Sequence, residues 1–173
     1  RRGRMLAAPA FRFEWRPDVY LDLEVPPSSD QVDLFLLTPE HVTDAYVAWL
    51  NDPSINQYLE SRYAVHTVES VRVFVRSMLD SPDNLLLGIH SHATGTHVGN
   101  IKLGPIDSHH RTAEMGILVG AREAWGRGIG TSAIVLLSDL ARERLLLRKV
   151  TAGCYASNVG SRRAFEKAGF LVE

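Results

Sequence analysis

A glycine-rich segment at residues 126–130 is the part of the sequence best suited to holding an anion. Glycine stands at positions 126, 128 and 130, between a segment typical of a strand, residues 111–119, and a segment with helical spacing, residues 128–144. Because glycine has no Cβ, the backbone can turn tightly and direct several N–H groups at one ligand. The positive end of the following helix dipole adds to the attraction. The segment therefore suits a diphosphate, with an ordinary helix-starting turn as the alternative interpretation.

Two common phosphate-binding motifs do not match this loop. A Rossmann fingerprint requires glycine at the position of Thr131, and a Walker loop requires Lys followed by Ser or Thr after its last glycine. The fold that contains the loop is therefore expected to be of another kind.

Glu114 is the candidate for proton transfer. It interrupts an otherwise apolar segment, residues 113–119, that precedes the glycine loop. A carboxylate buried near a cleft has a raised pKa and can remove a proton near neutral pH. A structural or surface-facing glutamate is the alternative.

Two other groups of reactive side chains are expected to be structural. The only cysteine, Cys154, lies in an apolar run and is expected to be a small core residue rather than an acyl carrier. His90, His92 and His97 could meet on a hairpin, but no carboxylate or cysteine completes a metal site with them. We therefore expect solvated histidines and no metal.

The elements that must position these residues are expected in the order β-α-α-β-β-β-α-β-α-β. Apolar or alternating runs predict strands at residues 32–37, 85–90, 97–103, 111–119 and 149–155, with a last strand begun at the end of the sequence. The run at 149–155 is expected to be buried. Caps and helical spacing predict helices that begin at Thr38, Thr67, Gly128 and Asn158 and end near residues 51, 81, 144 and 169.

Size and charge restrict the class of protein. The chain has 173 residues, 45% of them hydrophobic, which suits one domain at residues 32–173 after an N-terminal extension at residues 1–31. A net charge of −1 gives no field that would recruit nucleic acid or an anionic membrane, and no apolar run suggests a membrane span. We expect a cytoplasmic protein. The arginines of the extension could contact phosphate or an acidic partner, but a loosely packed tail is expected.

Three segments together resemble the GNAT N-acetyltransferase family. The run Trp125–Gly130 is similar to that family's motif A, with tryptophan where Gln or Arg is usual, as in many relatives of the ribosomal-protein acetyltransferases. Residues 113–119 are similar to the family's fourth strand, and residues 157–170 to its motif B. The resemblance extends from about Val32 to the end. It implies an α/β fold with a central mixed, mostly antiparallel sheet, helices on both faces, and splayed fourth and fifth strands.

The resemblance implies acetyl-CoA as co-substrate and assigns residues to it. The pantetheine arm would pair with the strand at Ile117, Leu118 and Val119, and Asn158 would hydrogen-bond the arm near the thiol. The same asparagine can also cap a helix. The diphosphate contacts map onto Arg122, Gly126, Arg127, Gly128, Ile129, Gly130 and Thr131.

The resemblance also implies catalytic roles. Glu114 stands at the position that serves several relatives as a base, directly or through water. The tyrosine that usually acts as acid in motif B is replaced by Phe165. Ser161 is the predicted substitute, with Tyr155, bound water or no dedicated acid as alternatives.

The resemblance also implies that the acceptor lies against residues 51–66, the loop between the first two helices. Candidate contacts are Asn56, Tyr58 and Arg62, with Glu60 and Tyr63 beside them. Residues 48–62 and 99–106 are similar to acetyltransferases of amino-sugar and surface-polysaccharide biosynthesis, which implies the primary amine of a nucleotide-linked amino sugar. The alternatives are the N-terminal α-amine of a ribosomal protein and a non-catalytic CoA sensor.

The family's closing C-terminal hairpin is missing from this sequence. The last residue, Glu173, stands just inside the predicted sixth strand, whereas relatives continue through a seventh. An open sheet edge promotes association. We therefore expect either a truncated sequence or another segment, or a second subunit in a homodimer, at that edge.

Overall fold

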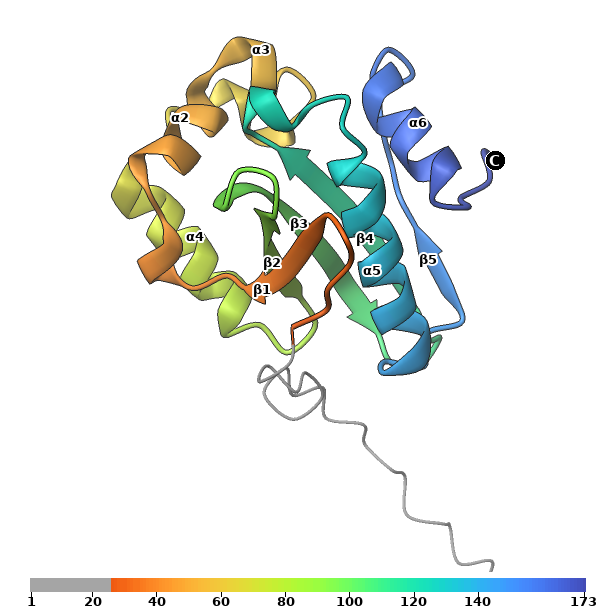
Figure 1. Ribbon diagram of the computed structural model, residues 1–173. Coiled ribbons are helices and arrows are strands. Elements are labelled where there is room, and N and C mark those ends of the chain that lie inside the picture. Colours follow the sequence, from red (N-terminus) through yellow and green to blue (C-terminus); the bar gives the residue numbers. More distant parts are fainter. Residues whose placement is uncertain (1–25) are drawn as a thin grey trace, which may run out of the picture.

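The fold is a mixed sheet between two layers of helices, seen in a computed structural model that describes residues 26–173 (Figure 1). The five strands lie in the order β1-β2-β3-β4-β5, and only β5 runs parallel to its neighbour. Their bounds are β1 Val32–Leu36, β2 Leu85–Ser91, β3 Thr96–Asp107, β4 Thr112–Val119 and β5 Lys149–Thr151. This confirms the predicted mixed, mostly antiparallel sheet.

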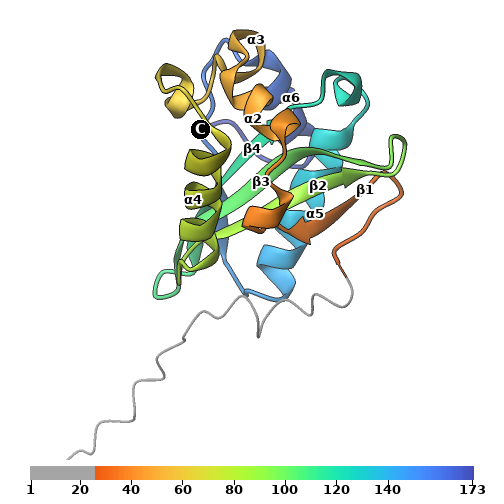
Figure 2. The same ribbon diagram turned by 90° about the vertical axis from the view of Figure 1, so that its left-hand side faces the viewer.

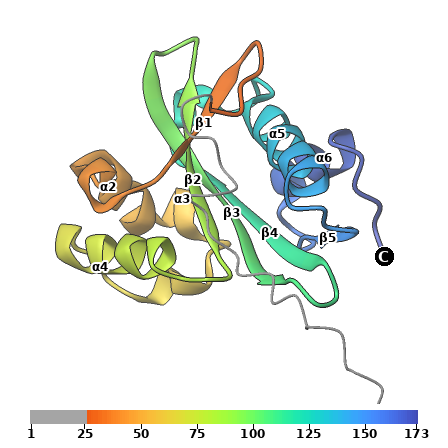
Figure 3. The ribbon, with the colours of Figure 1, turned by 90° about the horizontal axis from the view of Figure 1, so that it is seen from below.

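Helices cover both faces of the sheet, as predicted (Figure 3). On one face lie α2 Asp44–Asn51, α3 Pro53–Asn56 and α4 Val68–Leu79, and on the other α5 Ile129–Glu143 and α6 Val159–Lys167. Figure 2 shows α2 and α4 in front of the sheet and α5 behind it. Short 3-10 turns complete the connections at η1 Pro39–His41, η2 Glu60–Tyr63 and η3 Arg122–Ala124. No helix within residues 26–173 is long and apolar enough to cross a membrane.

Buried side chains form a core on both faces of the sheet, under α5 and under α2 and α4. Ile134 and Leu137, on one face of α5, are fully buried, as are Leu34, Ile101 and Met115 from three different strands. Their burial follows from the helical spacing of the first pair and the strand alternation of the others. The sheet therefore holds the N-terminus of α5 in a fixed place beside the end of β4.

The first predicted helix is divided in two. Thr38 caps only the turn η1, and Thr43 caps α2, where its hydroxyl accepts the N–H of Tyr46 at 3.2 Å. Two successive threonine caps thus delay the helix until Asp44. The segment 51–66, predicted to be irregular, contains α3 and η2.

The prediction that the strand beginning at Lys149 extends to Tyr155 was wrong. β5 ends at Thr151 and its residues are not buried, because only residues 112–114 of β4 pair with it. Cys154 follows the strand and is exposed, so the prediction of a core cysteine was also wrong. Residues 171–173 form no strand. The extension at residues 1–31 lies mostly outside the described residues.

Candidate active site

The parting of β4 and β5 creates an open strand edge. β5 pairs with β4 only from Thr112 to Glu114, whereas β4 continues to Val119 (Figure 1). Backbone groups of successive residues in a strand face opposite edges. The N–H of Gly120 donates to the Val98 carbonyl on the β3 side at 2.9 Å, so the carbonyl of Val119 faces the open edge.

The same alternation sorts the predicted pantetheine contacts. Ile117, like Val119, presents its backbone N–H and C=O to the open edge. The backbone groups of Leu118 face the other way, toward β3, where a Cβ placed on Gly99 would meet the Leu118 carbonyl oxygen. An extended ligand on this edge would therefore pair with the backbone of Ile117 and Val119, and Leu118 would offer its half-buried side chain.

The glycine loop follows at the same end of the sheet and has N–H groups that are unpaired within residues 26–173. Gly126 and Gly128 have φ of 70° and 83°, in the left-handed region that favours glycine. Ser132 is the first residue of α5 whose N–H bonds back along the chain, to the Gly128 carbonyl at 2.9 Å. The preceding N–H groups of Ile129, Gly130 and Thr131 belong to the first helical turn and suit an anion.

Trp125, which replaces the family's usual Gln or Arg, ties the loop to the strand. Its indole Nε1–H donates to the carbonyl of Val119 at 2.7 Å. This hydrogen bond occupies the last outward-facing carbonyl of β4 and leaves the N–H of Val119 for a ligand. The role was not predicted, because it depends on where a carbonyl of the previous strand points.

Arg122, a predicted diphosphate contact, forms an ion pair with the α2–α3 junction. Its Nη2 lies 2.9 Å from Oδ2 of Asp52, and it also donates to the hydroxyl of Ser54. Asp52 caps α3, and hydrogen bonds from Ser54, followed by the one from Arg122, lower the pKa of its carboxyl group. Arg122 thus links the segment after β4 to the start of the predicted acceptor loop.

Glu114 lies where the two strands part, and its side chain is exposed. Its neighbours Ala113 and Met115 are buried on the α5 side, so Glu114 points to the opposite face of the sheet. Its carboxylate lies beside the segment that leaves β5, since a Cβ placed on Gly153 would be 3.6 Å from Oε1. The expected burial of Glu114 is not present, and the carboxylate faces open space beside the parted strands.

Motif B places Asn158 at the N-terminus of α6. Its Oδ1 accepts the N–H of Ser161 at 3.1 Å, which makes it a helix cap. Within residues 26–173 its Nδ2 has no acceptor and remains able to donate to a ligand. Phe165 is buried against Phe170, with ring centroids 4.9 Å apart, so this position carries no proton donor.

The predicted acceptor loop contacts the segment after β5 through tyrosines. The hydroxyl of Tyr58 donates to the carbonyl of Ser157 at 3.1 Å. The hydroxyl of Tyr155 donates to Oε1 of Glu60 at 2.7 Å and accepts from Nη1 of Arg62 at 3.3 Å. These contacts bring Tyr58 and Arg62 together beside the parted strands, with Tyr155 between them.

Asn56, the third predicted acceptor contact, is largely internal. It is 6% exposed and its Nδ2 donates to the carbonyl of Leu50 at 2.7 Å. It also borders a surface depression of about 430 Å³ that Arg62 and Tyr63 help to line.

The hairpin histidines do not meet at one point. His92 Nε2 lies 3.0 Å from Oδ2 of Asp33, and His90 Nδ1 lies 4.0 Å from the same oxygen. His97 packs instead against Phe35 and Trp49, at 5.3 Å between ring centroids in each case. The prediction of a solvated His97 was therefore wrong. In the part of the chain that the structure describes, no three His, Cys, Asp or Glu side chains could hold a metal ion.

Comparisons with known proteins agree with this arrangement. Residues 32–171 match a family model described as the acetyltransferase (GNAT) domain. The probable N-acetyltransferase YjcK of Bacillus subtilis (strain 168) is 31% identical over 112 residues, which are 62% of this chain and 61% of that protein. The chain thus spans less than two thirds of the length of this relative.

Two solved structures have the same fold. Spermidine N-acetyltransferase from Vibrio cholerae, in complex with CoA and spermine, is 21% identical, with a TM-score of 0.73 over 84% of this chain and 83% of that one. The microcin C7 self-immunity acetyltransferase MccE, in complex with acetyl-CoA and AMP, is 20% identical, with a TM-score of 0.70 over 82% and 79%. The family match over most of the chain, together with this fold, shows that the protein belongs to the GNAT acetyltransferase family.

Proposed function

We propose that the protein transfers an acetyl group from acetyl-CoA to a primary amine. The observation that carries this proposal is the position of the open β4 edge directly before a loop with unpaired N–H groups. An extended pantetheine arm can pair with the edge at Ile117 and Val119. The diphosphate can then lie against the N-terminus of α5, where the helix dipole favours negative charge. One molecule that combines both parts is a coenzyme A thioester.

The side chains around this edge supply the remaining donor contacts. Asn158 Nδ2 is free to donate to the pantetheine arm near the thioester. Arg122 and Arg127 flank the loop and are assigned to the phosphates. For Arg122 this requires exchange of a partly exposed ion pair with Asp52 for one with phosphate, which costs little because such pairs are weak.

Acetyl transfer requires a base and a donor for the developing oxyanion. The acceptor ammonium must lose a proton before its nitrogen attacks the thioester carbonyl. Glu114 is assigned the role of base, directly or through water. Its exposed carboxylate lies where β4 and β5 part, on the face of the sheet opposite α5. A backbone N–H of the open β4 edge can stabilise the negative charge on the carbonyl oxygen. The C–S bond then breaks and the thiolate of CoA leaves.

Protonation of this thiolate has two protein candidates. Ser161 lies in the first turn of α6, and Tyr155 lies in the segment after β5. Because a CoA thiolate is already a tolerable leaving group, bound water can also supply the proton.

A nucleotide-linked amino sugar is the proposed acceptor. Tyr58 and Tyr155, with ring centroids 6.1 Å apart, are assigned to a base or a sugar ring, and the guanidinium of Arg62, which lies 4.5 Å from the centroid of the Tyr63 ring, is assigned to phosphate. Glu60 supports an alternative acceptor with a higher positive charge than an amino sugar. Its side chain lies in the same cluster and is 88% exposed, so its carboxylate can attract a cationic amine. Peptide N-termini and polyamines such as spermidine belong to that alternative.

Release of CoA thiol in the presence of different amines tests these assignments. The panel contains UDP- and dTDP-linked amino sugars, peptides with free N-termini, and spermidine, each with acetyl-CoA. We expect turnover with the nucleotide-linked amino sugars. Turnover only with peptides or spermidine would overturn the acceptor assignment and keep the reaction. Binding of CoA without turnover on any amine would favour the non-catalytic sensor.

A further inference from the structure

The turn before β1, residues 29–32, reaches the glycine loop through one side chain. The amide of Gln31 donates from Nε2 to the carbonyl of Arg127 at 3.3 Å and accepts at Oε1 from the hydroxyl of Ser132 at 2.7 Å. These two contacts lie on either side of Gly128 and span the start of α5. A Cβ placed on Gly128 would be 3.2 Å from the same Oε1. Gln31 thus lies directly against the left-handed turn of the loop.

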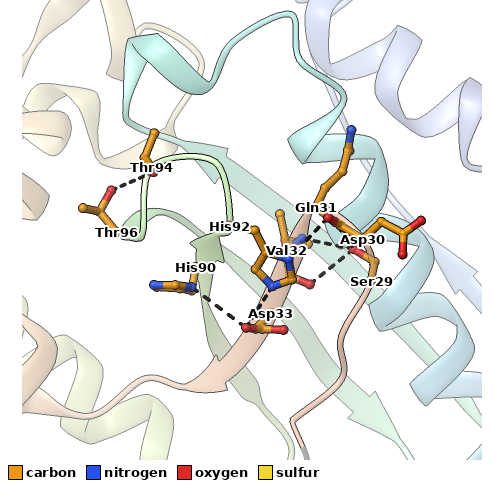
Figure 4. A network of polar contacts seen from close by, with 9 residues as sticks. All are labelled: Ser29, Asp30, Gln31, Val32, Asp33, His90, His92, Thr94 and Thr96. Carbon is orange, nitrogen blue, oxygen red and sulfur yellow. Dashed lines mark hydrogen bonds and ion pairs between the residues drawn. The ribbon is translucent and has the colours of Figure 1, made fainter.

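The turn itself is held in place by local hydrogen bonds (Figure 4). The hydroxyl of Ser29 accepts the N–H of Gln31 at 3.3 Å and that of Val32 at 3.1 Å. The N–H of Ser29 also donates to the carbonyl of Val32 at 2.9 Å. Gln31 therefore extends from a turn with little freedom, although its own side chain is exposed.

A second set of contacts fixes this turn to the end of β2. The N–H of His92 donates to the carbonyl of Gln31 at 2.9 Å. The ring of His92 contacts Asp33 Oδ2 through Nε2 at 3.0 Å and the carbonyl of Asp30 through Nδ1 at 3.3 Å (Figure 4). The hairpin between β2 and β3 thus supports the turn, and the turn supports the loop.

We infer that Gln31 is a positioning residue for the coenzyme's diphosphate. It has no assigned contact with the ligand. By holding the carbonyl of Arg127 and the hydroxyl of Ser132, it keeps the loop in the left-handed conformation that directs the N–H groups of residues 129–131 outward. This inference rests on the proposed acetyl-CoA site. It adds a residue outside the glycine loop to the determinants of donor affinity.

Calorimetric titration with CoA tests the role in four variants of the whole chain: Gln31→Ala, Ser132→Ala, their combination, and Ser138→Ala. The last is a matched control, because its hydroxyl bonds within α5, to the carbonyl of Ile134. We expect a three- to tenfold rise in Kd for CoA in each of the first two, about the value of one or two hydrogen bonds. The double variant should bind CoA no more weakly than the weaker-binding single variant, because both substitutions remove the hydrogen bond between Ser132 and Gln31.

Pantetheine, which lacks the diphosphate, separates positioning from general loosening. Titration followed by NMR can measure weak pantetheine binding, and its affinity should be unchanged in Gln31→Ala. Equal losses for CoA and pantetheine, or a Kd for CoA within twofold of wild type, would overturn the inference while leaving the proposed function intact. If the wild-type protein bound no CoA, the proposed function itself would fail.

Amide exchange in the free protein gives a readout that needs no ligand. If Gln31 holds the loop, Gln31→Ala should speed exchange of the Ser132 amide, which bonds to Gly128, by roughly fivefold or more. Amides of α4, on the other side of the sheet, should be unaffected. Unchanged exchange at Ser132 would contradict the positioning role even if CoA bound normally.

Discussion

At the scale of single residues, the proposed base differs in its surroundings from the one expected from sequence. Glu114 is exposed at the point where β4 and β5 part, whereas the sequence predicted a carboxylate buried near a cleft. An exposed carboxylate can accept a proton from the acceptor through a bridging water. Its position where the strands part, beside Gly153 in the segment that leaves β5, supports the catalytic assignment.

The Glu114→Gln variant tests this role. The amide keeps the size of the side chain and cannot accept the proton, so kcat should fall by about 10²-fold or more. The Kd for acetyl-CoA should not change, because no donor contact is assigned to Glu114. Thiol release and calorimetry measure the two quantities. Glu143→Gln, on the far end of α5, serves as the control, and an unaltered kcat in Glu114→Gln would remove it as the base.

His97 makes a prediction about stability and pH. Burial lowers the pKa of the His97 ring below its usual value of 6.5, although hydrogen bonds to Asn100 and the carbonyl of Gly99 oppose the shift. The folded state therefore disfavours the charged ring. The contribution of neutral His97 to the free energy of unfolding is fully present above the unfolded-state pKa. It is lost as pH falls from 6.5 through the folded-state pKa.

Urea unfolding at pH 7.5 and pH 5.5 measures this effect. The wild type should lose more free energy of unfolding than His97→Gln between these values, by at most about 1.4 kcal/mol per pH unit. Glutamine does not titrate, so the other histidines contribute equally to both proteins. Parallel losses in the two proteins would show that His97 has no such effect.

At the scale of elements, the loop between β4 and α5 depends on glycine for its backbone shape. Gly128 and Gly95 both have positive φ, 83° and 65°, but Gly95 lies in the turn between β2 and β3 with nothing within 4 Å of its Cβ position. The two glycines are therefore matched in backbone conformation, and only at Gly128 would an added Cβ also approach Gln31, at 3.2 Å from Oε1. Alanine strains the backbone similarly at both positions, and only Gly128 adjoins the proposed diphosphate site.

Replacement of each glycine by alanine separates strain from ligand binding. Both variants should lose about 1 kcal/mol of stability, roughly 2–4 °C in Tm. Only Gly128→Ala should bind CoA about tenfold more weakly, because the loop's N–H groups lose their common direction. Thermal unfolding and calorimetry provide the measurements. Equal CoA affinities in the two variants would place the diphosphate elsewhere.

At the scale of the whole molecule, the sequence predicted what depends on local patterns. The order of the elements from β1 to α6, apart from the short α3, follows from spacing and caps within a few residues, as do the buried face of α5 and the position of the glycine loop. The caps at Thr67 and Asn158 were confirmed for the same reason.

Features that depend on residues distant in sequence could not be predicted. β5 ends at Thr151 because its pairing with β4 ends there. Cys154 lies beyond this paired region and is therefore exposed. His97 is covered by Phe35 and Trp49, which belong to other elements. The contact of Gln31 with the loop also joins segments that no local pattern relates.

The central claim is that acetyl-CoA lies along the open edge of β4 and against the start of α5. An NMR titration of the labelled protein with acetyl-CoA, which observes each backbone amide, tests this most directly. We expect saturable shifts at the amides of Ile117 and Val119 and at residues 126–131, with little change in α4. No shifts at saturating acetyl-CoA, or shifts confined to the opposite end of α5 near Arg142, would contradict the account.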